Sequence, residues 1–195
     1  MKVRSIIAGV AFMAVSSTAF AGFDEGVAAY GQGDFKTALS TFHPLAEKGV
    51  SGAQYNLGRM YAYGQGVPQN YDEALKWYRR AAEKGYRMAQ HNIGDFYASG
   101  KGVQQNYTEA AKWFRIAAEN GYFHSQFNLG VLYAQGKGVP QSLTEAYAWL
   151  SVAATTGNEQ GIEVRDMVVR GLTQAHLKEG QKLAKEYFEK YPPRP

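Results

Sequence analysis

Apolar residues recur at helical spacing along most of the chain, in segments separated by short Gly-rich stretches. Between residues 71 and 83, apolar side chains stand three or four positions apart, which is the period of an amphipathic helix. They are Tyr71, Ala74, Leu75, Tyr78, Ala81 and Ala82. An earlier run, Ser51–Tyr63, stops at Gly64, and glycine is the residue that most often follows the last helical turn. The pattern therefore predicts a hairpin of two helices joined by a loop.

Capping residues support the start of the second helix. Asn70 precedes the helical run and Glu73 stands three residues later, which resembles a capping box with Asn in place of Ser or Thr. Ser142 and Glu145 give the standard form of the same motif. Pro68, in the loop between the helices, suits a non-helical position.

The hairpin is repeated every 36 residues. Residues 49–84, 85–120 and 121–156 align without gaps, and 15 of the 36 positions are identical in all three copies. We expect a degenerate capping repeat at 22–48, in which 23–32 is the first helix. C-terminal capping helices are expected over 157–191, and a frayed tail over 192–195. Repeats of this length are typical of solenoids, in which each unit stacks on the next.

Three kinds of repeated residue point to architecture. A glycine in the middle of each first helix costs about 1 kcal/mol relative to alanine, so we expect the backbone of a neighbouring helix to pass close to it. The repeated Tyr and Trp are expected to fill the space between hairpins. These positions are Gly58, Gly94 and Gly130, Tyr61, Tyr97 and Tyr133, and Trp77, Trp113 and Trp149.

These residues resemble the Sel-one-like repeat (SLR), a relative of the tetratricopeptide repeat with a longer interhelix loop. The resemblance is carried by the segments 53–61, 64–67 and 74–85 and their two further copies. The entry unit around Phe35–Gly49 is similar to those of exported bacterial members. The resemblance implies an all-α, right-handed superhelical solenoid of about ten helices. It also implies a scaffold role in protein–protein interaction, with no fixed catalytic residues and no cofactor.

Positions that differ between copies are where we expect binding specificity. By analogy with other helical-hairpin arrays, the first helices line the concave face, where Tyr and Arg are favoured anchors. The candidate partner-binding residues are Tyr55, Arg59, Tyr63, Met88, His91, Asp95, His124, Phe127, Val131 and Gln135. The alternatives are a plain solvated face, or packing of Tyr55 and Phe127 between hairpins.

The repeated Asn56, Asn92 and Asn128 have two interpretations. They can hold the backbone of a bound peptide, or they can hydrogen-bond the adjacent loop in every hairpin. We favour the loop, because a residue present in every copy more simply reflects shared architecture.

His91, Asp95 and His124 form a weak candidate for a metal or acid–base site. His91 and Asp95 share a helix face at i, i+4, and stacking of neighbouring repeats would bring His124 close to them. Two imidazoles and a carboxylate can hold zinc or transfer protons. No established metal motif has this spacing, so we predict neither a metal nor a catalytic site here.

The first 21 residues have the pattern of a secretory signal. Lys2 and Arg4 precede an apolar stretch over 6–15, and Ala19 and Ala21 occupy the two positions that a signal peptidase reads. The alternative is a membrane anchor, but ten apolar residues fall well short of the roughly 20 that a membrane-spanning helix needs. We therefore expect cleavage after Ala21 and a periplasmic or secreted protein without stable membrane insertion.

The composition excludes cysteine-based sites and disfavours nucleic acid as a partner. The chain has no cysteine, which excludes disulfides, thiolate metal sites and a cysteine nucleophile. The net charge of +4 is too small to favour nucleic acid as a partner. We therefore predict a non-enzymatic adaptor for a protein or peptide of the cell envelope. Two alternatives remain open: a module that binds cell-wall glycan through Tyr55, Tyr63 and Phe127, and, less favoured, a hydrolase dependent on His91.

Overall fold

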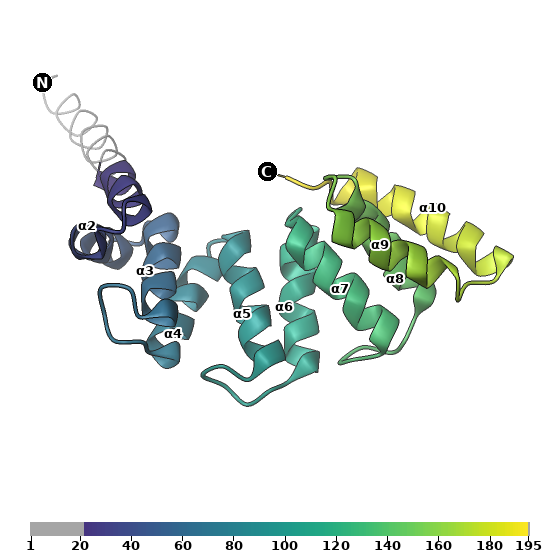
Figure 1. Ribbon diagram of the computed structural model, residues 1–195, viewed down its shortest axis with the longest axis horizontal. Coiled ribbons are helices and arrows are strands. Elements are labelled where there is room, and N and C mark those ends of the chain that lie inside the picture. Colours follow the sequence, from purple (N-terminus) through teal and green to yellow (C-terminus); the bar gives the residue numbers. More distant parts are fainter. Residues whose placement is uncertain (1–21, 195) are drawn as a thin grey trace, which may run out of the picture. The chain divides into compact units, whose positions relative to one another are not determined.

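A computed structural model describes residues 22–194, and all their regular structure is helical (Figure 1). The predicted signal sequence and Pro195 lie outside the described residues. The chain divides between Lys84 and Gly85 into two compact units. Unit 1 contains a helix over residues 22–31 followed by α2 (Phe35–Glu47), α3 (Ser51–Tyr63) and α4 (Tyr71–Ala82). Unit 2 contains α5 (Arg87–Ser99), α6 (Tyr107–Glu119), α7 (Phe123–Gln135), α8 (Leu143–Ala154), α9 (Glu159–Val169) and α10 (Gln174–Lys190).

Each repeat is a hairpin whose ends are fixed by the predicted residues. α3, α5 and α7 each end at a glycine in the left-handed region, which other residues rarely adopt. The next helix begins at a side-chain cap: Asn70 Oδ1 accepts from the Glu73 amide at 3.1 Å, and Ser142 Oγ accepts from the Glu145 amide at 3.2 Å. The predicted starts of the second helices are confirmed.

An invariant glutamine holds the loop of each hairpin. The Nε2 atoms of Gln69, Gln105 and Gln141 each donate to a carbonyl near the end of the preceding helix, at 2.8 Å in every copy. The loop is therefore held by its own repeated side chain. The repeated Asn does not have this role. Asn56 Nδ2 donates to Gly52 O within its own helix at 3.0 Å, so the predicted bond to the loop is wrong at this position.

The mid-helix glycines make room for a side chain of the second helix. A Cβ on Gly58 would lie 2.7 Å from two atoms of the Tyr78 ring, and 3.2 Å from the Ala74 carbonyl oxygen. At Gly94 the nearest group is the Phe114 ring, and at Gly130 it is the Leu150 side chain. The predicted close approach is present. The expectation that it is mainly a backbone contact is wrong, because a bulky side chain of the same hairpin fills the space.

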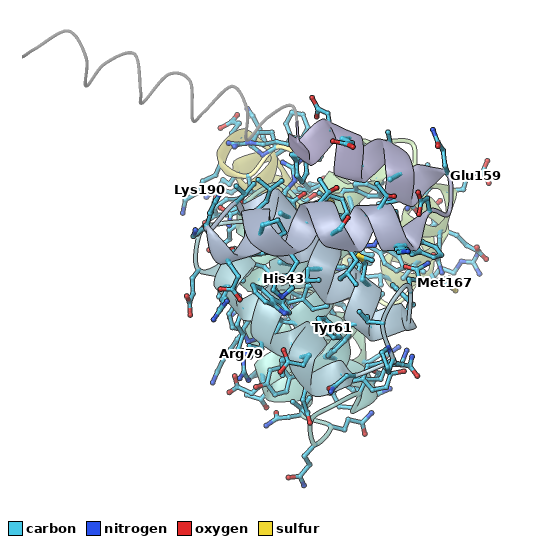
Figure 2. The ribbon with its side chains drawn as sticks, turned by 90° about the vertical axis from the view of Figure 1, so that its left-hand side faces the viewer. His43, Tyr61, Arg79, Glu159, Met167 and Lys190 are labelled. Carbon is cyan, nitrogen blue, oxygen red and sulfur yellow. The ribbon has the colours of Figure 1, made fainter. Side chains whose placement is uncertain are left out.

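The repeated Trp and Tyr join neighbouring helices within each unit. Figure 2 labels His43 of α2, Tyr61 of α3 and Arg79 of α4 in unit 1. Trp77 is 3% exposed and packs with Phe42 of α2, and Tyr61 packs against the same cluster. In unit 2, Trp149 is likewise 3% exposed, and Tyr97 and Tyr133 pack against its cluster. Trp113 is only half buried.

Two helices and a short segment close the C-terminal end of unit 2. α9 and α10 both pack on α8, and Thr173 caps α10 by accepting from the His176 amide. The predicted frayed tail differs from the structure. Residues 191–194 lie against the start of α7, where the Arg194 amide donates to Gly121 O at 2.9 Å.

None of the helices among residues 22–194 is both long enough and apolar enough to cross a membrane.

The close contact inside each hairpin predicts the effect of filling it. In the Gly94→Ala variant, the new methyl group would lie 2.6 Å from the Phe114 ring, which is itself 2% exposed. Overpacking costs about 1–3 kcal/mol, which outweighs the helix-propensity gain of about 1 kcal/mol. We expect a lower urea midpoint. In the control Gly31→Ala, no atom lies within 4 Å of the added methyl group, and the midpoint should stay or rise. A Gly94→Ala variant as stable as this control would contradict the steric explanation.

Candidate functional site

In unit 1 the predicted stripe Tyr55, Arg59 and Tyr63 lies along α3. The Arg59 guanidinium carbon lies 4.8 Å from the centre of the Tyr30 ring and 5.8 Å from that of Tyr55. Tyr55 also packs on Tyr78, with ring centres 5.9 Å apart. Tyr55 and Arg59 are therefore partly engaged in packing within unit 1. Tyr63, which is 65% exposed, is the most exposed aromatic side chain of the stripe. Tyr30 was not predicted, because only the fold brings residues 22–31 beside α3.

In unit 2 the predicted residues lie on two neighbouring first helices. Met88, His91 and Asp95 belong to α5, and the others belong to α7: His124, Phe127, Val131 and Gln135. An open groove of about 440 Å³ separates the C-terminal parts of these helices. We call it the α5–α7 groove. It is lined by Asp95, Ala98, Ser99, Lys101, Tyr107, Phe114, Asn128, Val131, Leu132, Gln135 and Lys137.

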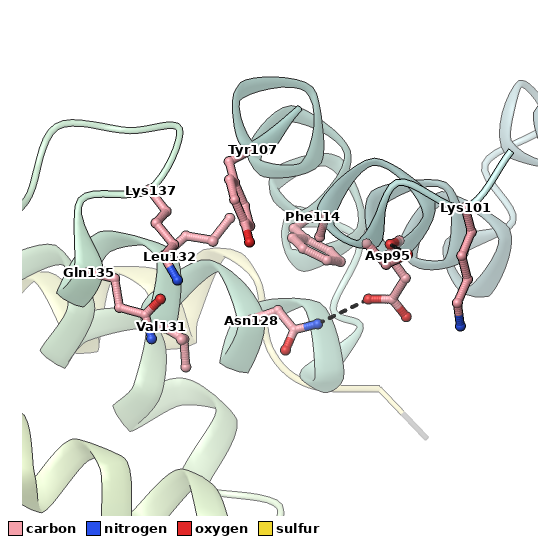
Figure 3. A pocket seen from close by; sticks show the side chains of 11 residues that line it. Asp95, Lys101, Tyr107, Phe114, Asn128, Val131, Leu132, Gln135 and Lys137 are labelled. Atoms are coloured by element: carbon pink, nitrogen blue, oxygen red, sulfur yellow. Dashed lines mark hydrogen bonds between the residues drawn. The ribbon is translucent and has the colours of Figure 1, made fainter. Parts of the chain in front are cut away.

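The α5–α7 groove has polar edges and an apolar wall. Asp95 and Asn128 face each other across it, and Asn128 Nδ2 donates to Asp95 Oδ1 at 3.4 Å (Figure 3). Lys137, from the loop after α7, places its Nζ 5.4 Å from the centre of the Tyr107 ring. Lys101, from the equivalent loop after α5, is exposed at the rim. The surface therefore offers an amide, a carboxylate, two ammonium groups and an aromatic face to a ligand.

Phe127 and Val131 face the C-terminal helices more than they face solvent. Both pack against the buried cluster that contains Leu150 of α8 and Val168 of α9. Both are half buried. The alternative in which Phe127 packs between hairpins therefore describes its position better than an open binding face does. Val131 contacts this cluster and also lines the α5–α7 groove.

His91, Asp95 and His124 do come together, and Ser125 is a fourth member of the cluster. His91 Nε2 lies 3.2 Å from Asp95 Oδ2, and His91 Nδ1 lies 2.8 Å from Ser125 Oγ. The ring centres of His91 and His124 are 5.9 Å apart. Ser125 stands where the other two copies have Ala53 and Ala89, so a departure from the repeat pattern was the available signal.

The geometry of this cluster fits a bridge between helices better than a reaction centre. The Asp95–His91–Ser125 order resembles a proton relay, but Ser125 is completely buried, so a substrate has no access to its hydroxyl oxygen. Both ring nitrogens of His91 already have a partner. Among residues 22–194, no group of three or more His, Cys, Asp or Glu side chains is arranged to hold a metal ion.

The surroundings of His124 in this cluster disfavour its protonated form. Desolvation and the nearby His91 lower the pKa of His124, and the Asp95 carboxylate opposes this shift. The ring packs closely on Phe123, with centres 3.8 Å apart, and on Tyr122, with centres 5.2 Å apart. The neutral imidazole is therefore favoured in the folded chain.

Comparisons with known proteins agree with the repeat architecture. The family model of the Sel1 repeat matches residues 51–86, 87–122 and 124–158, which together are more than half of the chain. Among curated proteins, the chain is 44% identical over 57 residues to an exopolysaccharide production negative regulator of Rhizobium meliloti (strain 1021). That match covers 29% of this chain and 21% of the relative.

Two solved structures share the fold. One is a protective antigen of uropathogenic Escherichia coli strains, which displays an SLR fold. It is 31% identical, with a TM-score of 0.63, over 89% of this chain and 46% of that one. The other is a Sel1 repeat protein from Oxalobacter formigenes, 36% identical with a TM-score of 0.64, over 69% of this chain and 39% of that one. The chain spans less than half the length of each of these three proteins. The predicted solenoid fold class is confirmed.

The lowered pKa of His124 predicts a pH-dependent stability. Below the ordinary histidine value of 6.5, the unfolded chain binds a proton at this position more readily than the folded chain does. Acidification from pH 7 to pH 5 therefore lowers the free energy of unfolding, because proton uptake at this position favours the unfolded chain. The free energy of unfolding should fall more steeply over this interval in the wild type than in His124→Asn. Urea titrations at several pH values measure both slopes, and a steeper fall in His124→Asn would contradict the assignment.

Proposed function

This chain belongs to the Sel1 repeat family, whose repeats generally serve as protein-interaction scaffolds, and we propose that it is an exported scaffold that binds a protein or peptide through the α5–α7 groove. The observation that carries this proposal is the groove itself, an open surface between equivalent ends of two repeats. Sel1 repeats are generally non-catalytic, and we propose the same for this chain.

The composition of the groove supports specificity for one partner. Asp95 on α5 corresponds to Val131 on α7, and Ser99 corresponds to Gln135. The invariant positions around them are used for caps, loops and packing, so these variable positions are the ones free to determine what binds. Repeat arrays bind their partners on surfaces of this kind.

The chemistry of the groove suits a polypeptide. The partly exposed Tyr107 and Val131 offer apolar surface for a side chain, and Asn128 and Gln135 offer donors and acceptors for backbone amides. The groove is already formed between α5 and α7, which both pack on α6, so binding requires little ordering of the scaffold.

Export is supported by the sequence alone. The basic residues, the apolar stretch and the Ala19–Ala21 spacing have the order of a cleavable signal. We propose that the mature chain begins at Gly22 and works in the periplasm or outside the cell, with a partner in the cell envelope.

A glycan ligand is the second candidate. Tyr63 is 65% exposed, and Tyr107 lines the groove together with Asn128 and Gln135. Accessible aromatic rings of this kind can stack on sugar rings. The Rhizobium meliloti relative is named a negative regulator of exopolysaccharide production, which favours testing polysaccharide as well as protein.

Substitution of exposed groove residues tests the protein partner. We expect a Gln135→Ala/Lys137→Glu bait to recover at least tenfold less of a specific envelope protein than the wild type. The two changes remove a polar anchor and reverse a charge at the rim, while both side chains are exposed and their loss should leave the fold intact. Gln181→Ala/Lys182→Glu makes the same chemical change on the exposed face of α10 and should bind as the wild type does.

Recovery is measured by quantitative mass spectrometry after pull-down from an envelope extract, with folding checked by circular dichroism. An envelope protein enriched equally by all three baits would overturn the assignment to this groove. Retention on purified peptidoglycan or exported polysaccharide, reduced by Tyr63→Ala or Tyr107→Ala and without an enriched protein, would establish the glycan candidate instead.

Export predicts a processed chain in a bacterial host. The mature protein should be found in the periplasmic or secreted fraction with the intact mass of residues 22–195. Ala21→Asp should block cleavage, because a signal peptidase needs a small residue directly before the cut. Phe20→Asp changes the intervening position and should still be processed. Unprocessed wild-type protein in the cytoplasm would refute export.

A further inference from the structure

The last residues of the chain bind to unit 2 in the manner of an extended peptide. Gly121 O accepts a hydrogen bond from the Arg194 amide at 2.9 Å, and Gln126 Nε2 donates to Tyr191 O at 2.8 Å. Pro192 and Pro193 stand between these two anchors. We call residues 191–194 the tail, and the surface that holds it the tail groove.

The tail groove is built from buried groups of the third repeat. Gln126 is completely buried, and Trp149 stacks on Tyr191 with ring centres 5.8 Å apart and planes inclined by 20°. A Cβ on Gly121 would lie 2.5 Å from the Pro192 carbonyl oxygen, so only glycine lets the tail approach so closely. These contacts recognise one aromatic ring and two backbone groups of the tail.

The first repeat has the same glutamine but no tail, so it shows which contacts belong to every repeat and which ones bind the tail. Gln54, the equivalent of Gln126, donates to Ala46 O at 3.0 Å. Gln126 makes the same bond to Ala118 O at 3.1 Å and, in addition, the bond to the tail. In the first repeat, Gly49 O accepts from the Lys84 ammonium group. The peptide-like contacts with residues 191–194 are thus added to a shared framework.

Space for a longer ligand adjoins the tail. Pro193 and Arg194 form one wall of a hollow of about 430 Å³. Its other walls are Phe123 at the start of α7 and Thr156, Gly157 and Asn158 in the turn between α8 and α9. It is large enough for a further side chain of a bound segment.

We propose that the tail groove is a second peptide-binding site, which accepts from a partner protein an extended segment with an aromatic residue directly followed by prolines. The chain's own tail occupies the site as a tethered competitor. Prolines pre-order such a segment and lower the entropy lost on binding. Two backbone hydrogen bonds fix its direction, and the Trp149 face selects the aromatic ring. This site is separate from the α5–α7 groove, and its test does not depend on that proposal.

The covalent attachment of the tail affects the measured affinity for an added peptide. The tail follows α10 directly, with Tyr191 as the C-cap of that helix, so its effective concentration at the groove is of the order of millimolar or higher. The apparent affinity for a free peptide is reduced by the fraction of chains in which the groove is empty. Loosening the tail should therefore strengthen peptide binding without changing the groove.

The test uses the full chain and a fluorescein-labelled peptide with the sequence of residues 189–195. In the Tyr191→Gly/Pro192→Gly/Pro193→Gly variant, which lacks the stacking ring and the pre-ordered prolines, fluorescence anisotropy should show saturable binding. The dissociation constant should be at least about tenfold lower than for the wild type. A peptide with glycine in place of its tyrosine should bind at least about tenfold more weakly, because it loses both the stacking on Trp149 and the burial of the ring.

Matched glutamine variants separate the site from general stability. In the loosened chain, Gln126→Leu should weaken peptide binding at least fivefold, because it removes the donor to the peptide carbonyl. Gln54→Leu removes the equivalent architectural bond in the first repeat and should leave binding unchanged. Circular dichroism checks that each variant is folded. If the triple variant does not fold, Pro192→Gly/Pro193→Gly takes its place, with an expected gain of at least threefold.

Three results would overturn the proposal. They are no saturable binding to the loosened chain, equal affinity in the loosened and wild-type chains, and equal loss of binding in Gln126→Leu and Gln54→Leu. In each case the tail would be a structural strap and not an occupant of a recognition site.

Discussion

The rest of the structure depends on one close contact inside each hairpin, where a glycine of the first helix faces a bulky side chain of the second. The pairs are Gly58 with Tyr78, Gly94 with Phe114, and Gly130 with Leu150. Because the first helix has no side chain at this point, one large side chain of the second helix packs directly against its backbone. The contact sets how the hairpin closes, and therefore where the variable faces of α5 and α7 lie.

The fold was largely predictable because local signals and the repeat period agree. Gly64 and Asn70 mark a helix end and a helix start by their own backbone and side-chain chemistry, and three aligned copies remove the ambiguity of a single one. The partner of Gly58 was harder to identify. A mid-helix glycine indicates a close neighbour, but a sequence does not say whether that neighbour is a backbone or a ring. The anchoring of residues 191–194 was also missed, since proline-rich ends have no period from which packing can be inferred.

The candidate site was predictable only in part, because it depends on contacts between repeats. Helical spacing correctly placed His91 and Asp95 on one face, and the repeat register brought His124 near them. Ser125 completes that cluster only through the stacking of α7 on α5, and Tyr107 enters the α5–α7 groove from the start of α6. For Phe127 the expectation of an open binding position was too simple. The residue lies on α7 as predicted, but α9, which is not part of the repeat pattern, covers part of its side chain.

The anchored tail also changes how unit 2 is expected to come apart. A linear array of hairpins usually unravels from its free end, since the last unit has only one neighbour. Here Tyr191 is fastened to Gln126, 65 positions earlier in the chain. This long-range tie raises the contact order of unit 2 above that of a simple stack, so its closure is expected to form late in folding. A mechanical load applied to the residues after α10 passes through the contacts of the tail with the start of α7 before it reaches α10. We therefore expect α7, α8, α9 and α10 to resist such a load together.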